Sequence, residues 1–340
     1  MLAARSVLRT QAQLASAARV NTVARALSTS SVAYDAKQRA DSMQRVTVFG
    51  AGLMGAGIAQ VSAQAGLKVT LTDVTDKALE NGINIIKKSV ARVAKKQQPD
   101  DIEGFTNKVL QNISTSTDAG AAVADTDLVV EAILENLKVK QDLFAFLDTK
   151  AKKDTIFASN TSSLSIGEIA LKCSEERQTQ FAGLHFFNPV PAMKLVEVVR
   201  TPKTSQEVFD TLLELSVRLG KVPVKCKDMP GFIVNRLLVP YLLEAVRMVE
   251  RGDATPEDID IAMKLGAGYP MGPFELLDFI GLDTTQFIAQ GWITKAEEGL
   301  VPLDLIKPTD LMAKLVEQGK LGRKSGAGFY DYSSGKPNKG

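Results

Sequence analysis

A glycine-rich turn between a strand-like run and a helix-like run constrains the fold of this chain more than any other feature. The run Arg45–Phe49 is rich in apolar and β-branched residues, and three glycines in the spacing G-x-G-x-x-G follow it directly. Apolar residues then recur at helical spacing until Gly66 interrupts the pattern. Strand, tight turn and helix in this order are typical of the first unit of a doubly wound α/β sheet that binds a dinucleotide.

If a dinucleotide binds at the turn, each of its three positions requires glycine for a different physical reason. Gly50 permits the tight turn, Gly52 lets the backbone approach a pyrophosphate, and Gly55 allows the helix to pack close to the strand. The helix N-terminus adds N–H donors and the positive end of the helix dipole. A glycine-rich turn that holds no ligand is the alternative interpretation.

A second strand-like run, residues 68–73, ends in an acid 18 residues beyond the last glycine of the turn. A carboxylate at this place accepts hydrogen bonds from ribose hydroxyls and repels a 2′-phosphate, which favours NAD over NADP. We therefore expect NAD as the cofactor. The expected contacts are the turn residues and this acid: Gly50, Gly52, Leu53, Met54, Gly55 and Asp73.

Further apolar runs continue the predicted sheet, and polar residues follow several of them. The predicted strands span residues 127–133, 155–160, 181–184, 196–199 and 222–227. The polar side chains near or beyond the strand ends are Glu135, Asn160, Thr161, Ser162 and Asn188. Ligands of open parallel sheets lie outside the carboxyl ends of the strands, so we expect these side chains to line one cleft.

The chain contains one histidine in 340 residues, His185, and it directly follows the predicted strand 181–184. Histidine has an unperturbed pKa of about 6.5, so it can exchange a proton near neutral pH. Glu197, twelve positions later, can orient the ring and stabilise its cation. An imidazole buried for packing among Phe181, Phe186 and Phe187 is the alternative. The position beside the predicted cleft favours acid–base catalysis.

The residues after the second strand form an amphipathic helical pattern with two different faces. The apolar stripe consists of Leu79, Ile83, Ile86, Val90 and Val93. The opposite side carries five cations, which are Lys87, Lys88, Arg92, Lys95 and Lys96. Such a face is either merely solvated or a docking surface for a polyphosphate-bearing substrate such as coenzyme A, and the pattern does not separate the two.

The length of 340 residues indicates two domains, and a cluster of helix and strand breakers at residues 228–231 marks the boundary. We expect residues 35–228 to form a Rossmann-type domain, a doubly wound and mostly parallel sheet with a helical insertion. We expect residues 229–340 to form an all-α C-terminal domain. Its helical patterns cover residues 232–251, 256–266, 274–279, 284–297 and 310–318. A small helical unit rich in Leu, Ile and Met predicts a homodimer formed through this domain.

Residues 1–34 contain four arginines, many alanines and serines and no acid, which is typical of a mitochondrial transit peptide. We therefore expect the protein in the mitochondrial matrix. The whole chain has 41 basic and 39 acidic residues, so the part after residue 34 is slightly acidic, which argues against nucleic-acid binding. No apolar run reaches the roughly 20 residues of a membrane-spanning helix.

The two cysteines, Cys173 and Cys226, have no metal-ligand spacing and form no disulfide framework. They predict free thiols in a reducing or redox-neutral compartment, and we expect no metal site.

Five ordered motifs relate the chain to a known family. They are the glycine turn and residues 159–163 (SNTSS), 183–190 (GLHFFNPV), 231–236 (GFIVNR) and 264–273 (KLGAGYPMGP). In these motifs the chain resembles the L-3-hydroxyacyl-CoA dehydrogenases, and among them the monofunctional mitochondrial members. The resemblance covers about residues 45–332. It implies NAD-dependent oxidation of (S)-3-hydroxyacyl-CoA to 3-ketoacyl-CoA in fatty-acid β-oxidation.

The resemblance also implies a role for each matching residue. His185 would be the catalytic base and Glu197 its partner, with Ser162 and Asn235 holding the reacting oxygen of the substrate. The implied cofactor contacts on the nicotinamide side are Glu135, Lys140, Ser162, Asn188 and Lys324, and the implied substrate contacts are Ser89, Lys96 and Ser162. Two alternatives remain. The chain could be another NAD-linked hydroxyacid dehydrogenase that uses a lysine base, or a non-catalytic NAD-binding structural protein on the same fold.

Overall fold

The computed structural model of this protein describes residues 35–334 and separates the chain into two units, with the boundary between Asp228 and Met229. The predicted transit peptide, residues 1–34, lies outside the described residues. Within residues 35–334, no helix is both long enough and apolar enough to cross a membrane.

The first unit is built on one sheet of eight strands in the order β3-β2-β1-β4-β5-β6-β7-β8. Neighbouring strands are parallel except for β6 and β7, which are antiparallel. The strand order reverses between β1 and β4, which is the switch point where dinucleotides bind in such sheets. The predicted doubly wound, mostly parallel sheet is confirmed. The strands are β1 (Arg45–Phe49), β2 (Lys68–Thr72), β3 (Ile113–Ser116), β4 (Leu128–Glu131), β5 (Ile156–Ser159), β6 (Phe181–Phe186), β7 (Leu195–Arg200) and β8 (Val222–Lys227).

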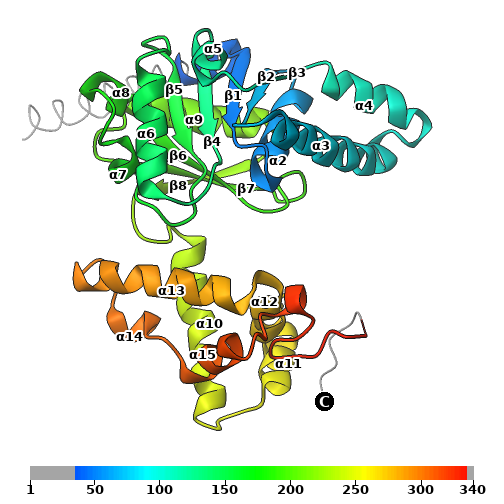
Figure 1. Ribbon diagram of the computed structural model, residues 1–340, viewed down its shortest axis with the longest axis vertical. Coiled ribbons are helices and arrows are strands. Elements are labelled where there is room, and N and C mark those ends of the chain that lie inside the picture. The colour runs from blue at the N-terminus through cyan, green and yellow to red at the C-terminus, as the bar shows by residue number, and fades with distance from the viewer. Residues whose placement is uncertain (1–34, 335–340) are drawn as a thin grey trace, which may run out of the picture. The chain divides into compact units, whose positions relative to one another are not determined.

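Helices connect these strands and cover the sheet (Figure 1). They are α2 (Leu53–Gln64), α3 (Asp76–Gln97), α4 (Ile102–Leu110), α5 (Ala119–Val123), α6 (Leu137–Asp148), α7 (Ile166–Ala170), α8 (Glu175–Thr179) and α9 (Gln206–Arg218). The sequence pattern does not predict α4 or β3. β3 has the sequence Ile-Ser-Thr-Ser and is an edge strand, so it is held by backbone pairing with β2 rather than by apolar burial.

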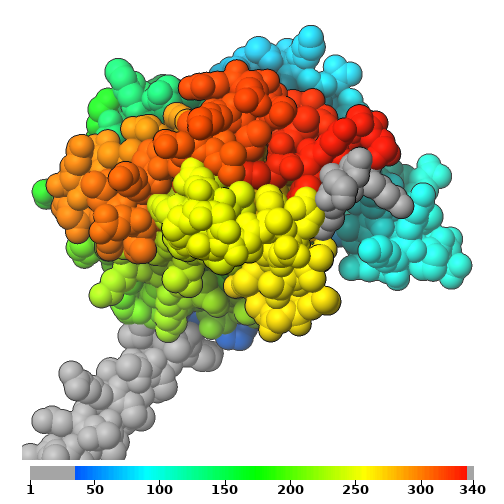
Figure 2. Space-filling view, turned by 90° about the horizontal axis from the view of Figure 1, so that it is seen from below, coloured from blue at the N-terminus to red at the C-terminus, as the bar shows by residue number. Residues whose placement is uncertain are grey.

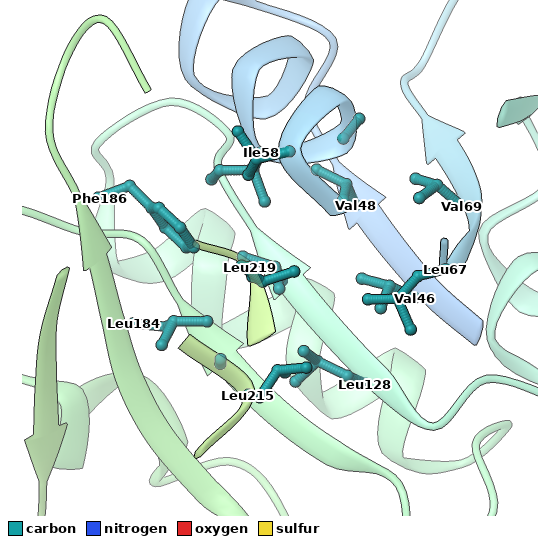
Figure 3. Close-up of a cluster of buried hydrophobic side chains, with 14 of the residues drawn as sticks. Val46, Val48, Ile58, Leu67, Val69, Leu128, Leu184, Phe186, Leu215 and Leu219 are labelled. Carbon is teal, nitrogen blue, oxygen red and sulfur yellow. The ribbon is translucent and has the colours of Figure 1, made fainter. Parts of the chain in front are cut away.

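One face of the sheet packs against α2 and α9. Figure 3 shows Val46, Val48 and Leu128 of the strands beside Ile58 of α2 and Leu215 of α9, all at most 1% exposed. Successive residues of a strand point to opposite faces, so Val46 and Val48 meet this core while Thr47 points the other way. Burying such side chains contributes roughly 1.5–3 kcal/mol each.

The opposite face of the sheet is covered around α6 by an aromatic cluster. Phe144 of α6 lies with its ring centroid 4.6 Å from that of Phe181 in β6 and 5.5 Å from that of Phe157 in β5. All three rings are fully buried. The two packed faces make β4, β5 and β6 a rigid base for the residues at their carboxyl ends.

The helical insertion extends beyond the β3 edge of the sheet as the pair α3 and α4 (Figure 1). Thr75 caps α3 by accepting a hydrogen bond from the Ala78 N–H. Leu79, Ile86 and Val90 are buried, as the apolar stripe predicts. The five predicted cations are all exposed. The amphipathic pattern therefore identified both faces of this helix correctly.

The second unit consists of helices, which confirms the predicted all-α architecture. In Figure 2 the residues of α10 and α11 (yellow) adjoin those of α13 to α15 (orange to red) in a continuous surface. Thr255 caps α11 with proline in its first turn, as predicted, and α10 continues through Pro240. The helices are α10 (Val234–Glu250), α11 (Pro256–Gly266), α12 (Pro273–Ile280), α13 (Leu282–Glu297), α14 (Leu303–Ile306) and α15 (Asp310–Glu317).

Two buried aspartates fasten the C-terminal segment of this unit. Asp278 of α12 accepts hydrogen bonds from the N–H groups of Phe329 and Tyr330 at 2.8 and 2.9 Å. Asp260 of α11 accepts the Tyr330 hydroxyl at 2.8 Å. Burial raises the pKa of both carboxyl groups, although these donors oppose the shift. The segment held in this way includes Lys324, one of the predicted site residues.

Candidate active site

The glycine turn after β1 has the geometry that each glycine predicts. Gly50 has a φ of +96°, and a Cβ there would clash with the backbone carbonyl of Ala132. A Cβ at Gly55 would clash with the Gly50 carbonyl, so this glycine allows α2 to pack against the turn. A Cβ at Gly52 would have no atom within 4 Å. The turn therefore leaves open space at the one glycine where a pyrophosphate is expected to approach.

Asp73, the predicted ribose ligand, also supports the turn. Its Oδ2 accepts the Ala51 N–H at 2.7 Å, and its Oδ1 accepts the Val74 N–H at 2.7 Å. The side chains of Leu53 and Val74 beside it are 65% and 89% exposed. Backbone donors at a helix N-terminus, a carboxylate and exposed apolar side chains suit the phosphates, ribose and base of a dinucleotide. The residues present therefore fit NAD.

His185 and Glu197 face each other across the antiparallel strands β6 and β7. The register pairs them directly, and directly opposite residues in a sheet share one face. His185 Nδ1 lies 2.7 Å from Glu197 Oε2, with the two side chains 7% and 0% exposed. With the Glu197 carboxylate as the acceptor of this bond, Nδ1 is the donor nitrogen and Nε2 is the nitrogen on the other side of the ring.

The position of His185 in its strand differs from the sequence prediction. The predicted strand ends at residue 184, whereas β6 continues to Phe186 because β7 pairs with it on the outer side. Asn160, which follows β5, accepts the Phe186 N–H at 2.8 Å. The Phe187 ring lies with its centroid 4.5 Å from that of His185. The imidazole is therefore fixed by strand pairing, a carboxylate and a neighbouring ring.

The loop that follows β5 is gathered around the carboxylate of Glu135. Glu135 Oε1 accepts the Ser162 N–H at 3.2 Å and the Ser163 hydroxyl at 3.1 Å, and it also accepts the Thr161 hydroxyl. The structure thus brings together two of the predicted site residues, Glu135 and Ser162, at the carboxyl ends of β4 and β5. Thr161, which was also expected to line the cleft, belongs to this cluster, and Ser163 is an additional member.

Lys140, a predicted cofactor contact, lies at 1% exposure between two carboxylates. Its Nζ lies 2.5 Å from Glu131 Oε1 and 3.1 Å from Glu135 Oε2. Burial alone would raise the pKa of the Glu135 carboxyl, but Lys140 and the hydroxyls of Thr161 and Ser163 hold that pKa below its usual range. Sequence reasoning missed Glu131, and a charged residue at the end of an apolar strand was the signal that could have found it.

Asn188 is exposed in the loop that joins β6 to β7. Lys221 fastens this loop by donating from its buried ammonium group to the backbone carbonyls of Val190 and Met193, the latter at 2.9 Å. Burial lowers the pKa of the Lys221 ammonium to about 8. The sequence offered no signal for Lys221, because its partners are backbone carbonyls.

The remaining predicted contacts lie on the insertion and in the second unit. Ser89 and Lys96 are seven residues apart on α3, which is about two turns, so they share one side of the helix. In the second unit, Asn235 lies in the first turn of α10. Lys324 pairs there with Asp283 at 2.6 Å.

The thiols do not provide an alternative nucleophile. Both cysteines are buried and free, as predicted. Burial raises the pKa of Cys173 to about 12, and burial together with the nearby Glu197 charge raises that of Cys226 to about 11. Both thiols are therefore protonated near neutral pH. Within residues 35–334, no cluster of His, Cys, Asp and Glu side chains is arranged to hold a metal ion.

Most of the chain matches the two domains of one known protein family. Residues 45–229 match the family described as "3-hydroxyacyl-CoA dehydrogenase, NAD binding domain", and residues 231–332 match "3-hydroxyacyl-CoA dehydrogenase, C-terminal domain". The chain belongs to the 3-hydroxyacyl-CoA dehydrogenase family. The family match confirms the resemblance seen in the five motifs, the dehydrogenase class and NAD as the cofactor.

Three relatives of this 3-hydroxyacyl-CoA dehydrogenase family member are similar to it over nearly their whole lengths. The chain is 57% identical to "Hydroxyacyl-coenzyme A dehydrogenase, mitochondrial" of Sus scrofa over 311 residues, which is 91% of this chain and 97% of that protein. It is 56% identical to the Homo sapiens protein of the same name, with the same coverage. The crystal structure of (S)-3-hydroxybutyryl-CoA dehydrogenase from Ralstonia eutropha matches with a TM-score of 0.79 and 40% identity, covering 86% of this chain and all of that one.

The glycine turn predicts that dinucleotide binding and folding stability can be separated by mutation. We expect Gly52→Ala to weaken NADH binding at least about tenfold, an amount that corresponds to about 1.4 kcal/mol. Its methyl group would enter the space expected for the pyrophosphate and touch no protein atom. Gly55→Ala should instead lower the free energy of unfolding by more than about 1 kcal/mol, because its methyl group clashes with backbone.

Fluorescence titration with NADH and thermal unfolding measure the two effects. A Gly52→Ala protein that binds NADH as tightly as the wild type would contradict the placement of the pyrophosphate.

Proposed function

We propose that this protein oxidises (S)-3-hydroxyacyl-CoA to 3-ketoacyl-CoA in fatty-acid β-oxidation, with His185 as general base and Glu197 as its partner. The observation that carries the assignment of the base is the buried cross-strand contact of 2.7 Å between these two side chains. The contact lies near the carboxyl end of β6. The glycine turn follows the carboxyl end of β1, so both lie on the same side of the sheet, beyond the strand ends.

His185 performs the proton transfer in this proposal. Its Nε2 accepts the proton of the C3 hydroxyl group while the C3–H bond breaks, and the hydroxyl carbon becomes a carbonyl. NAD, when bound, supplies the acceptor for the hydride that leaves C3. The imidazole becomes a cation in this step, and the adjacent Glu197 carboxylate stabilises it. The Nδ1–H bond to Glu197 also keeps Nε2 as the nitrogen that faces the reaction.

Hydrogen-bond donors complete the proposed site. Ser162 and Asn235 hold the reacting oxygen, where charge develops as the proton departs. Glu135, Lys140, Ser162, Asn188 and Lys324 form the nicotinamide side of the cofactor site. The tight placement of the Ser162 loop by Glu135 supports this role, because a donor must be preorganised to stabilise developing charge.

Coenzyme A docks on the insertion helix in this proposal. The five exposed cations of α3 provide a positive surface for the phosphate groups, and Ser89 and Lys96 are the proposed direct contacts. Long-range attraction by such a surface raises the local concentration of an anionic substrate. If these cations were only a solvated face of the helix, they would not contribute to binding of the substrate.

The alternatives have less support in the described residues. A lysine base would need an amine that is not held in an ion pair, whereas Lys140 is buried between two carboxylates and Lys324 pairs with Asp283. A non-catalytic NAD-binding protein would not need an imidazole held by a fully buried carboxylate. Assays with acyl-CoA and free 3-hydroxy acids distinguish the first alternative, and any turnover excludes the second.

We also propose that the protein acts in the mitochondrial matrix. The relatives from Sus scrofa and Homo sapiens carry the word mitochondrial in their names, and the composition of residues 1–34 is that of a transit peptide.

Substitution of the pair tests the proposed chemistry. We expect His185→Gln to lower kcat by about 10²- to 10⁴-fold, the usual contribution of general acid–base catalysis, while NADH still binds. Glu197→Gln should lower kcat with a nearly unchanged KM and alter the dependence of kcat/KM on pH, because an amide stabilises the imidazolium less. The measurement is NADH formation followed spectrophotometrically with 3-hydroxyacyl-CoA substrates from short to long. Near-normal turnover of His185→Gln would rule out this base.

Charge reversal on α3 tests the proposed docking of coenzyme A. We expect Lys96→Glu to raise KM for 3-hydroxyacyl-CoA about 3- to 10-fold with little change in kcat, because attraction of the anionic substrate is lost. The difference should shrink in high salt, where exposed charges are screened. Lys153→Glu is the matched control, since Lys153 is exposed just before β5 at the amino end of the sheet. Equal effects of the two variants would disprove docking on α3.

The homodimer is a further part of the proposal, and we place its interface on the helical unit. Leu237, Leu265, Phe279 and Phe287 of this unit are 59–83% exposed. We expect a solution mass at micromolar concentration of twice that of one chain, and a shift towards monomer in Phe287→Glu. Light scattering or sedimentation provides the measurement, and a monomeric wild-type protein would refute the dimer.

A further inference from the structure

Glu131 is a fully buried carboxylate that takes no part in the proposed chemistry. It is the last residue of β4, and its side-chain partners are Ser159 of the neighbouring strand β5 and two residues that follow β4, Ile133 and Lys140. Its Oε1 accepts the Ile133 N–H at 2.8 Å and lies 2.5 Å from Lys140 Nζ. Its Oε2 accepts the Ser159 hydroxyl at 2.6 Å. A buried charge with this many partners is costly to displace.

Two routes lead from Glu131 to the loop that carries Ser162. The first runs through Lys140 to Glu135, whose Oε1 accepts the Ser162 N–H at 3.2 Å. The second runs through Ser159, whose hydroxyl oxygen accepts the Thr161 N–H at 3.2 Å. Glu135 and the Thr161 hydroxyl are themselves hydrogen-bonded, so the two routes close into a ring.

The ring joins two loops that the backbone alone would leave independent. Glu135 lies in the loop from β4 to α6, and Thr161 and Ser162 lie in the loop from β5 to α7. Lys140 carries one positive charge between two carboxylates, so it draws Glu135 inwards against the Ser162 loop. Without the charge of Glu131, Lys140 would retain one carboxylate partner and could move with it.

We propose that Glu131 is a positioning residue that sets the location of Ser162 through this ring. The inference rests on the proposed function, in which Ser162 holds the reacting oxygen of the substrate. A donor displaced by about 1 Å from its productive place can reduce the rate by up to about 10²-fold. The effect of Glu131 therefore appears in turnover, although its side chain is enclosed in protein.

A double-mutant cycle tests this proposal. Glu131→Gln keeps the size of the side chain and removes its charge. We expect it to lower kcat about tenfold or more, with KM for 3-hydroxyacyl-CoA within about twofold of the wild type. In the background of Ser162→Ala, the same substitution should lower kcat by less than about threefold, because the residue that it positions is already gone. Equal effects in both backgrounds would overturn the proposal.

A matched control separates positioning from stability. Thr155→Val removes a buried hydrogen bond of 2.8 Å from the Thr155 hydroxyl to the Thr126 carbonyl, next to the opposite end of β5. We expect Thr155→Val to lower Tm and leave kcat unchanged. If Glu131→Gln lowers Tm and leaves kcat unchanged, as the control does, Glu131 has only a structural role.

A second variant serves if Glu131→Gln does not fold. Ser159→Ala breaks the second route without removing a charge. It should lower kcat, by less than Glu131→Gln because the route through Lys140 remains, with KM nearly constant and the same dependence on Ser162. A Ser159→Ala protein with wild-type kcat would then overturn the proposal. Wild-type protein that produces no NADH from any 3-hydroxyacyl-CoA would instead refute the proposed function itself.

Discussion

The hydrogen bond between His185 and Glu197 depends on one feature of the fold, the antiparallel direction of β7. Because β7 runs against β6, Glu197 near its start lies directly opposite His185 near the end of β6, at 2.7 Å. In a parallel pair the start of β7 would lie at the amino ends of the other strands, far from the dinucleotide turn at their carboxyl ends. The core beneath the strands holds this register, since a slip of β7 by one residue would turn Glu197 to the face of the sheet opposite His185.

The Rossmann-type unit also contains buried charged side chains near the site. Glu197, Glu131 and Lys140 are at most 1% exposed, and each has a charged or ionisable partner. Such groups contribute little net stability, because desolvation offsets their attraction. Their distances and orientations are nevertheless closely restricted. They lie at the carboxyl end of β4, in the first turn of α6 and near the start of β7, where a reaction needs fixed donors and acceptors. Stability comes mainly from the two apolar faces of the sheet.

Sequence reasoning succeeded where one residue type has one physical explanation. The glycines of the turn, the stripe of α3 and the Thr255 cap all follow from local sterics or period, and the structure reproduces each of them. It failed for β3, because an edge strand of Ile-Ser-Thr-Ser is held by backbone pairing. It also failed for Glu131 and Lys221, whose partners are distant in the sequence or belong to the backbone.

The sequence by itself determined the nucleotide-binding turn, the helical insertion with its cations, and the identity of the single imidazole with its acidic neighbour. Local conformation depends on residues a few positions apart, so a pattern can reveal it. Only the tertiary structure decided the direction of β7, the contact between His185 and Glu197, and the ring around Glu131. An alternating pattern is the same for parallel and antiparallel strands, and a buried ion pair leaves no periodic trace, because its members meet only after the sheet has formed.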